Sequence, residues 1–245
     1  MSGLKHFTLL LVSPQRFTDR QAASMDRKTI SGFPYEHADL KPHHGILLPL
    51  IHRQLNALEH ANLRLKTDRR IFELGCGNGA VAQALSEKGW NVTGVDPSSE
   101  GIALANRRYP SLNLHEGSAY EDLSGTYGQY PVVLSLEVVE HTYFPRLWAA
   151  AVYALLQPGG TAIISTPYHG YWKNLALATT GQLDDHFTAL WDHGHIKFWS
   201  IKTLTILLRE AGFTDIVFHR VGRLPPIAKH MIAVAIKPVD PRQGA

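Results

Sequence analysis

An apolar segment that runs straight into a glycine-rich turn constrains the fold of this chain more than any other feature. The segment is Ile71-Phe72-Glu73-Leu74, and Gly75-Cys76-Gly77-Asn78-Gly79 follows it directly. Apolar residues at helical spacing resume after the turn, so the pattern indicates a strand, a tight turn and a helix. Glycines let the backbone amides of such a turn approach a ligand without a Cβ collision. The sequence therefore predicts a nucleotide-like ligand at this turn.

The middle of the chain continues the same alternation of strand and helix. Short apolar segments alternate with helical stretches at 70–74, 80–88, 91–95, 99–107, 112–115, 132–136, 144–156 and 161–165. Units of this size favour an α/β fold with a doubly wound, Rossmann-like, mostly parallel sheet and helices on both faces. A helix is expected before them at 46–61 and another after them, between Ser200 and Gly212. Two last apolar segments, 215–218 and 231–236, suit an antiparallel pair at the sheet edge.

The chain reads as one domain with a leading segment. Its 245 residues suit a single large α/β core. We expect residues 1–45 to be a tail and lead-in, and residues 46–245 to form the domain. Residues 167–199 interrupt the alternation and are rich in aromatic and histidine side chains, with a short helix expected near 173–180. We interpret 167–199 as an ordered lid inserted over the site.

Composition narrows the setting and the partners. Hydrophobic residues make up 44% and charged residues 18% of the chain, which excludes a mainly disordered or polytopic membrane protein. A formal net charge of +3 does not indicate a nucleic-acid partner. The only cysteine, Cys76, excludes an internal disulfide and is typical of a cytoplasmic protein. We expect a small-molecule partner and no integral membrane segment, and the oligomeric state stays open.

Two acidic residues narrow the choice of ligand. Asp96 ends the second strand about twenty residues after the glycines, the spacing at which an acid reaches the ribose hydroxyls in a Rossmann-type unit. Glu73 lies immediately before the turn, where a carboxylate would repel a pyrophosphate and attract a sulfonium and an ammonium group. This pair of acids favours S-adenosylmethionine over NAD.

Taken together, the motifs resemble those of class I S-adenosylmethionine-dependent methyltransferases. The resemblance covers about residues 70–237 and is nearest to the quinone-biosynthesis O-methyltransferases. It is carried by Glu73 with the glycine turn, and by the segments Gly94–Ser98, Glu137–His141, Leu156–Gly160, Ile164–Tyr168 and Leu208–Phe213. The resemblance implies a seven-stranded sheet in the order 3-2-1-4-5-7-6, with strand seven antiparallel.

The resemblance also implies which residues contact the donor. Glu73 and the turn would face the methionine part, Asp96 the ribose and Pro97 the adenine. Ser118 stands where the family often has an aspartate, so its adenine contact is expected to be weaker or to come from the backbone of the next residue. The full set expected at the cofactor is Glu73, Gly75, Cys76, Gly77, Asp96, Pro97, Ser118, Ala119, Leu136 and Glu137.

Histidines supply the candidates for acid–base chemistry. His141 follows the fourth strand near the expected cofactor, and a neutral imidazole is available near pH 7. The lid adds His193, His195 and Tyr168. Glu137, Glu140 and His141 have the spacing of ligands on one helical turn and could bind a divalent cation, but shared letters of this kind also occur without metal, and we assign none.

The expected function is therefore methyl transfer from S-adenosylmethionine to a small-molecule acceptor, with oxygen favoured over nitrogen or carbon. Two alternatives stay open at this point. A nicotinamide-dependent oxidoreductase would use the same glycine turn and Asp96. A catalytically silent protein that binds the cofactor and acts as a scaffold would keep Glu73 and Asp96 as well.

Overall fold

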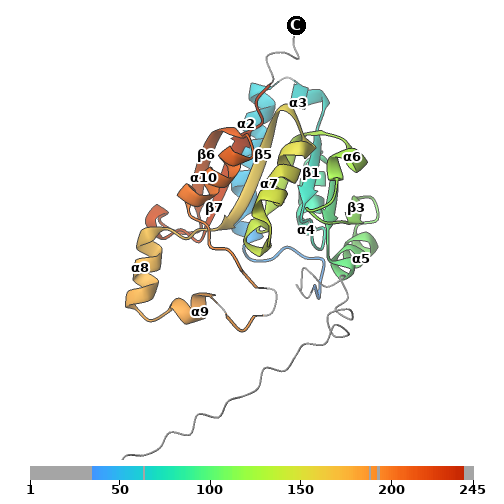
Figure 1. The fold of residues 1–245 in the computed structure, drawn as a ribbon. Helices are drawn as coiled ribbons and strands as arrows, with labels where there is room; N and C mark the ends of the chain where they lie inside the picture. The colour runs from blue at the N-terminus through green and yellow to red at the C-terminus, as the bar shows by residue number, and fades with distance from the viewer. Residues whose placement is uncertain (1–34, 63, 188, 192–193, 240–245) are drawn as a thin grey trace, which may run out of the picture.

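The computed structural model describes residues 35–239, except for 63, 188 and 192–193 (Figure 1). A seven-stranded sheet with the order β3-β2-β1-β4-β5-β7-β6 forms its centre. The strands β1 to β5 run parallel, and β7 is antiparallel to both β5 and β6. The predicted fold class is confirmed. The strands are β1 Arg70–Leu74, β2 Asn91–Asp96, β3 Asn113–Glu116, β4 Tyr130–Leu136, β5 Leu156–Pro167, β6 Thr214–Val221 and β7 His230–Ile236.

Helices cover both faces of the sheet because neighbouring strand residues point to opposite sides. Ile71 belongs to the apolar cluster that includes Leu47 of α2 and Val81 of α4. Phe72 belongs to the other cluster, which includes Trp148 of α7. The α-helices are α2 His44–Ala61, α3 Arg64–Thr67, α4 Ala80–Ser86, α5 Ser99–Arg108, α6 Leu123–Tyr127, α7 Pro145–Leu155, α8 Tyr171–Thr179, α9 Leu183–Phe187 and α10 Ile201–Glu210.

The sequence pattern missed part of β5 and several short helices. The sequence predicts a helix over 144–156 and a strand that begins at residue 161. Instead β5 starts at Leu156, which pairs with Tyr130, and the register shifts before Val132 pairs with Thr161. The segment Pro158-Gly159-Gly160 therefore forms an irregularity inside the strand. The helices α3, α6 and α9 are each too short to produce a helical repeat of apolar residues.

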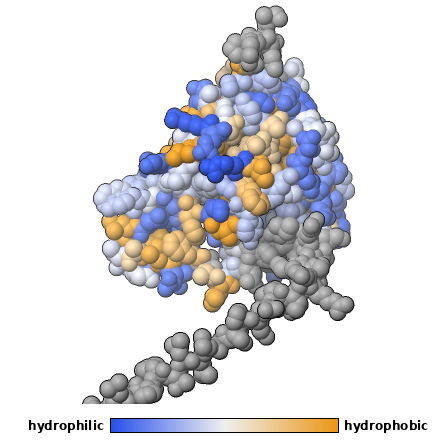
Figure 2. All heavy atoms as spheres, in the orientation of Figure 1, coloured by the Kyte–Doolittle hydropathy of each residue, from blue (hydrophilic) through white to orange (hydrophobic). Residues whose placement is uncertain are grey.

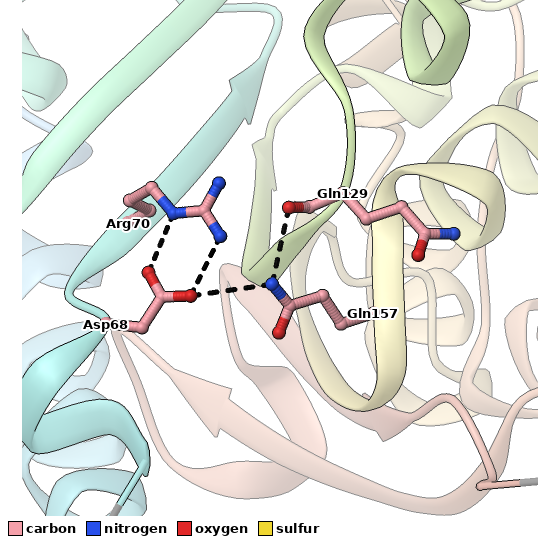
Figure 3. A network of polar contacts seen from close by, with 4 residues as sticks. All are labelled: Asp68, Arg70, Gln129 and Gln157. Atoms are coloured by element: carbon pink, nitrogen blue, oxygen red, sulfur yellow. Dashed lines mark hydrogen bonds and ion pairs between the residues drawn. The ribbon is translucent and has the colours of Figure 1, made fainter. Parts of the chain in front are cut away.

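A network of polar side chains connects the strands at the edge of the sheet where β1, β4 and β5 begin, which is opposite to the candidate site (Figure 3). The guanidinium of Arg70 donates two hydrogen bonds to Asp68, at 2.7 and 2.8 Å. The amide of Gln157, in β5, donates to the same carboxylate and to the backbone carbonyl of Gln129, each at 3.4 Å. These contacts connect the start of β1 with the starts of β4 and β5.

The opposite, carboxyl edge of the sheet is where the chain leaves each parallel strand, and β7 begins there because it is antiparallel. His230, its first residue, pairs with Pro167 at the end of β5. From that edge the segment with α8 and α9 projects away from the sheet (Figure 1). Figure 2 shows hydrophobic residues exposed among polar ones on this projection. Its exposed large side chains include Tyr171, Trp172 and Leu190. Its role as a lid stays a prediction.

Within the described residues, no helix has the length and apolar character that crossing a membrane requires.

Candidate functional site

A cavity of about 760 Å³ opens at the carboxyl edge of the sheet. Cavities of this size hold drug-sized ligands. It is lined by all the residues that the sequence assigned to the cofactor, namely Glu73, Gly75, Cys76, Gly77, Asp96, Pro97, Ser118, Ala119, Leu136 and Glu137. The fold therefore brings these residues, which come from the ends of four strands, to one cavity.

The glycine turn between β1 and α4 has a backbone that only glycine adopts easily. Gly75, Gly77 and Gly79 have positive φ angles of 87°, 52° and 75°. A Cβ on Gly75 would collide with Val138, and a Cβ on Gly77 would collide with the hydroxyl of Tyr35. Close approach of side chains and positive φ angles both require bare backbone here.

Asp96 holds this turn in place. One carboxylate oxygen accepts the amide hydrogen of Gly77 and the other that of Ser98, each at 2.9 Å. Burial raises the pKa of Asp96 to about 6, although the two backbone hydrogen bonds act in the opposite direction. The residue is only 5% exposed but lines the cavity, so the remaining lone pairs of its carboxylate are available to a ligand there.

Glu73 is a buried acid without a full set of partners. Its residue is 2% exposed, and Oε2 has no hydrogen-bond partner. Burial, together with the negative charge of Asp96, raises its pKa well above the usual range. A buried carboxylate with an unpaired oxygen is costly unless a donor or cation meets it. This side chain lines the cavity directly beside the glycine turn.

Cys76 is buried in the apolar cluster that contains Ile71, and it also lines the cavity. Its Cβ lies against Gly94, where a Cβ on the glycine would approach it to 2.8 Å. Burial, with the charges of Asp96 and Glu73, raises the pKa of the thiol well above its usual range. A protonated, buried thiol is chemically inert.

The lead-in segment before α2 closes one side of the cavity. The amide of Asn78 donates hydrogen bonds to the carbonyls of His37 and Asp39 at 2.8 and 3.1 Å, and the hydroxyl of Tyr109 donates to that of Ala38. Tyr35 then lies against Gly77 and lines the cavity. Burial, followed by the charge of Asp96, raises the pKa of Tyr35, which keeps its phenol protonated.

Ser118 and Ala119, after β3, line the far side of the cavity with Glu116 and Tyr120. The hydroxyl of Ser118 accepts a hydrogen bond from the backbone of Tyr120 at 3.3 Å. Its oxygen therefore shapes the local turn as well as facing the cavity.

His141 and His195 meet at the other end of the cavity. Their ring centroids lie 4.8 Å apart in an edge-to-face arrangement, and Trp191 contacts both rings. Nδ1 of His141 lies 3.2 Å from the carbonyl oxygen of Gly194, which can only accept, so Nδ1 carries the proton. Burial, with the charge of His141, lowers the pKa of His195 to about 4, so His195 is neutral at pH 7.

Glu137 joins three strands of the sheet at this end. It follows β4 and has a positive φ angle of 54°, which is unusual outside glycine. Its carboxylate accepts a hydrogen bond from the hydroxyl of Ser165 in β5 at 2.8 Å and pairs with Nδ1 of His230 in β7 at 3.0 Å. Burial acts to raise the pKa of Glu137, but the hydrogen bond and charge of His230, together with the hydrogen bond from Ser165, act against it, and the pKa is lowered.

The residues whose ligand atoms lie close enough to hold a cation together are not the three that the sequence suggested. Ligand atoms of Glu140, His141 and His195 all lie within 4.8 Å of one another. Glu137 instead pairs with His230. Burial, with the charge of Glu137, raises the pKa of Glu140 well above the usual range.

The remaining predicted catalytic residues fall elsewhere. Tyr168 does not line the cavity; its ring packs in the apolar core and lies 5.9 Å from the guanidinium carbon of Arg220. His193 lies outside the described residues. Sequence reasoning missed His230. The available signal was its place directly before the last apolar segment, because an antiparallel last strand begins at the edge where the parallel strands end.

The sheet order, the bare-backbone turn and two buried acids facing one cavity define a Rossmann-like nucleoside-binding domain. The chain belongs to the Methyltransferase domain family, whose model matches residues 46–217.

Similar proteins share this family and fold. The chain is 30% identical over 155 residues to the ubiquinone biosynthesis O-methyltransferase of Psychrobacter arcticus, covering 60% of this chain and 59% of that protein. It is 33% identical over 148 residues to the ubiquinone biosynthesis O-methyltransferase of Aeromonas salmonicida, covering 59% of this chain and 62% of that protein. The chain thus spans less than two thirds of these relatives.

Two solved structures show the same fold. A SAM-dependent methyltransferase from Archaeoglobus fulgidus superposes with a TM-score of 0.54 at 17% identity, covering 76% of this chain and 94% of that one. Human N-acetylserotonin methyltransferase in complex with SAM superposes with a TM-score of 0.54 at 16% identity, covering 71% of this chain and 49% of that one.

Proposed function

We propose that this protein transfers a methyl group from S-adenosylmethionine to a hydroxyl oxygen of a small planar acceptor. When bound, the donor supplies a methyl group on a positively charged sulfur, and its transfer leaves a neutral thioether. The family and the names of its relatives support this activity over a nicotinamide-dependent oxidoreductase.

The observation that carries the donor assignment is the unpaired, buried oxygen of Glu73 beside the glycine turn. A buried carboxylate repels a pyrophosphate and attracts an ammonium or sulfonium group. The residues present therefore fit this donor. Glu73 would bind the ammonium group and Asp96 the ribose hydroxyls. The bare backbone at Gly75 and Gly77 would let the methionine part of the donor approach closely.

The acceptor assignment comes from the other end of the cavity. His141 and His195 line it with Trp191 beside them. Neutral imidazoles accept hydrogen bonds from a hydroxyl group, and the indole of Trp191 offers an aromatic face to a planar ring. We therefore favour a phenol-like acceptor over an amine or an acidic carbon.

The setting of the protein follows the same proposal. We expect a small-molecule partner, no nucleic acid and a reducing compartment such as the cytoplasm, the last from the single cysteine.

Two measurements test this function. Titration calorimetry should detect S-adenosylhomocysteine binding and no comparable binding of NADH. Transfer of labelled methyl from S-adenosylmethionine should then be followed with a panel of phenols and matched anilines. We expect label in the phenols. Binding of NADH alone would favour the oxidoreductase, whereas donor binding without transfer to any acceptor would favour a scaffold.

A further inference from the structure

His230 and Glu137 form a buried pair that the sequence hypotheses did not connect. The two side chains are 14% and 15% exposed, and Nδ1 of His230 lies 3.0 Å from Oε2 of Glu137. Both residues line the cavity. The sheet order brings them together. Only β5 separates β4 from β7, and β7 begins at the edge where β4 and β5 end.

The orientation of Glu137 is fixed independently of His230. Ser165 donates its hydroxyl hydrogen to Oε1 at 2.8 Å, and the Glu137 amide donates to the Ser165 carbonyl at 3.0 Å. The backbone of Glu137 is also held at a positive φ angle. Strained backbone of this kind persists where surrounding contacts enforce it and is concentrated at functional sites. The carboxylate is thereby aimed at one nitrogen of one histidine.

This pairing determines what the histidine can do. A carboxylate accepts the Nδ1 hydrogen of the neutral ring, so the lone pair is left on Nε2. The same carboxylate stabilises the imidazolium that forms when Nε2 takes a proton. His141 is oriented by the neutral carbonyl of Gly194 instead, and His195 lies against it, where a second positive charge is disfavoured.

We infer that His230, positioned by Glu137, is the general base that removes the proton from the acceptor hydroxyl. This inference rests on the proposed function. The O–H bond breaks, its electron pair stays on the acceptor oxygen, and the proton forms an N–H bond at Nε2 of His230. Since the acceptor gains a methyl group and loses a proton, one proton leaves the imidazolium for water in each turnover.

Other charged groups face the pair and belong to its environment. His43, from the lead-in segment, lies with its ring centroid 6.3 Å from that of His230. The charge of His230 also acts on His195, and that of Glu137 on Lys173 of α8. Burial lowers the pKa of His43, which keeps that neighbour neutral at pH 7.

The first test needs no methyl transfer. A nitrocatechol, whose anion absorbs visible light, is titrated with pH in the presence of saturating S-adenosylhomocysteine and excess protein. The wild-type protein and the control variant His219→Gln, changed on β6 outside the cavity lining, should lower the apparent pKa of the bound probe by at least one unit, whereas His230→Gln should not. Equal shifts in wild type and His230→Gln, loss of the shift in His219→Gln, or no binding of the phenol by the wild type would each overturn the inference.

The second test uses turnover and donor affinity together. Removing a general base lowers rates by about 10²–10⁴-fold, so we expect His230→Gln to lower kcat by at least about 100-fold. Donor affinity should change less than twofold. The variant's kcat should keep rising with pH as the acceptor ionises by itself, whereas wild-type kcat levels off.

Glu137→Gln tests the positioning role. It should lower kcat and move the point at which kcat levels off to lower pH. A matched control is His219→Gln, because His219 also hydrogen-bonds through its ring, to Gln54, and lies on β6 outside the cavity lining. A kcat for His230→Gln within threefold of wild type, or an equal loss in His219→Gln, would contradict the assignment. Absent S-adenosylhomocysteine binding in the wild type would instead refute the proposed function.

Discussion

Asp96 accepts the amide hydrogen of Gly77 at 2.9 Å, and both residues line the cavity. The acid that ends β2 therefore also holds the bend that follows β1. This couples the expected ribose contact to the shape of the turn that would receive the methionine part of the donor. Because Ser98 donates to the other carboxylate oxygen, the start of α5 depends on the same side chain.

Asp96→Ala should weaken S-adenosylhomocysteine binding by at least about tenfold, the loss of roughly one charged hydrogen bond. The variant removes the ribose partner and leaves the Gly77 amide unpaired. Calorimetry measures the affinity, and Asp184→Ala, an exposed acid of α9, controls for the loss of charge. Unchanged affinity in Asp96→Ala would count against the site.

Donor affinity should fall as pH falls below about 6. Burial raises the pKa of Asp96 to about 6, so a proton competes with the ribose hydroxyls below that pH. Each further drop of one pH unit should weaken donor binding by up to about tenfold through protonation of Asp96. Calorimetry of S-adenosylhomocysteine from pH 5 to 8 gives the dependence. In Asp96→Asn this part of the slope should vanish; an equally steep slope there would assign it to another group.

Glu73→Gln should stabilise the ligand-free protein and weaken donor binding. The pKa of Glu73 is raised on folding, so the folded state holds its proton more tightly than the unfolded chain does. Stability is then lost as pH rises above the ordinary glutamate value, and the variant escapes this loss.

Thermal unfolding of wild type and Glu73→Gln between pH 5 and 8 tests this. The Tm advantage of the variant should grow with pH, and saturating S-adenosylmethionine should reverse it, because only the carboxylate attracts the ammonium group. A constant difference at all pH values would contradict the argument.

Local patterns were sufficient to predict a mostly parallel sheet, whereas the strand order followed from the family resemblance. They also predicted residues that line one end of the cavity. The apolar segment before the glycines and Asp96 at the end of the next strand are close in sequence to the turn they build, so spacing alone places them together. The same holds for the helix expected between Ser200 and Gly212, because Ser200 accepts the amide hydrogen of Thr203 as its cap residue.

The acceptor end could not be predicted in this way, because its residues meet only after the chain has folded. His230 lies 93 positions from Glu137, and their pairing depends on β7 being antiparallel beside β5. Tyr35 lies against Gly77 in a lead-in segment whose carbonyls accept hydrogen bonds from Asn78 and Tyr109, far along the chain. The spacing of Glu137, Glu140 and His141 suggested one shared cluster, yet the positive φ angle of Glu137 turns it towards β7.

Gly77→Ala should destabilise the protein by more than its backbone conformation alone explains. A positive φ angle at a non-glycine residue costs about 1–3 kcal/mol, and at Gly77 the new Cβ would also collide with Tyr35. Gly181→Ala is a matched control, since Gly181 has a φ angle of 70° with nothing within 4 Å of the added Cβ.

Urea unfolding of both variants separates the two contributions. Gly77→Ala should lose more stability than Gly181→Ala, and combining it with Tyr35→Ala should recover part of the difference, because the collision is then absent. Donor affinity should fall in Gly77→Ala and stay unchanged in Gly181→Ala. Equal losses of stability in the two glycine variants would show that Tyr35 does not close against the turn in solution.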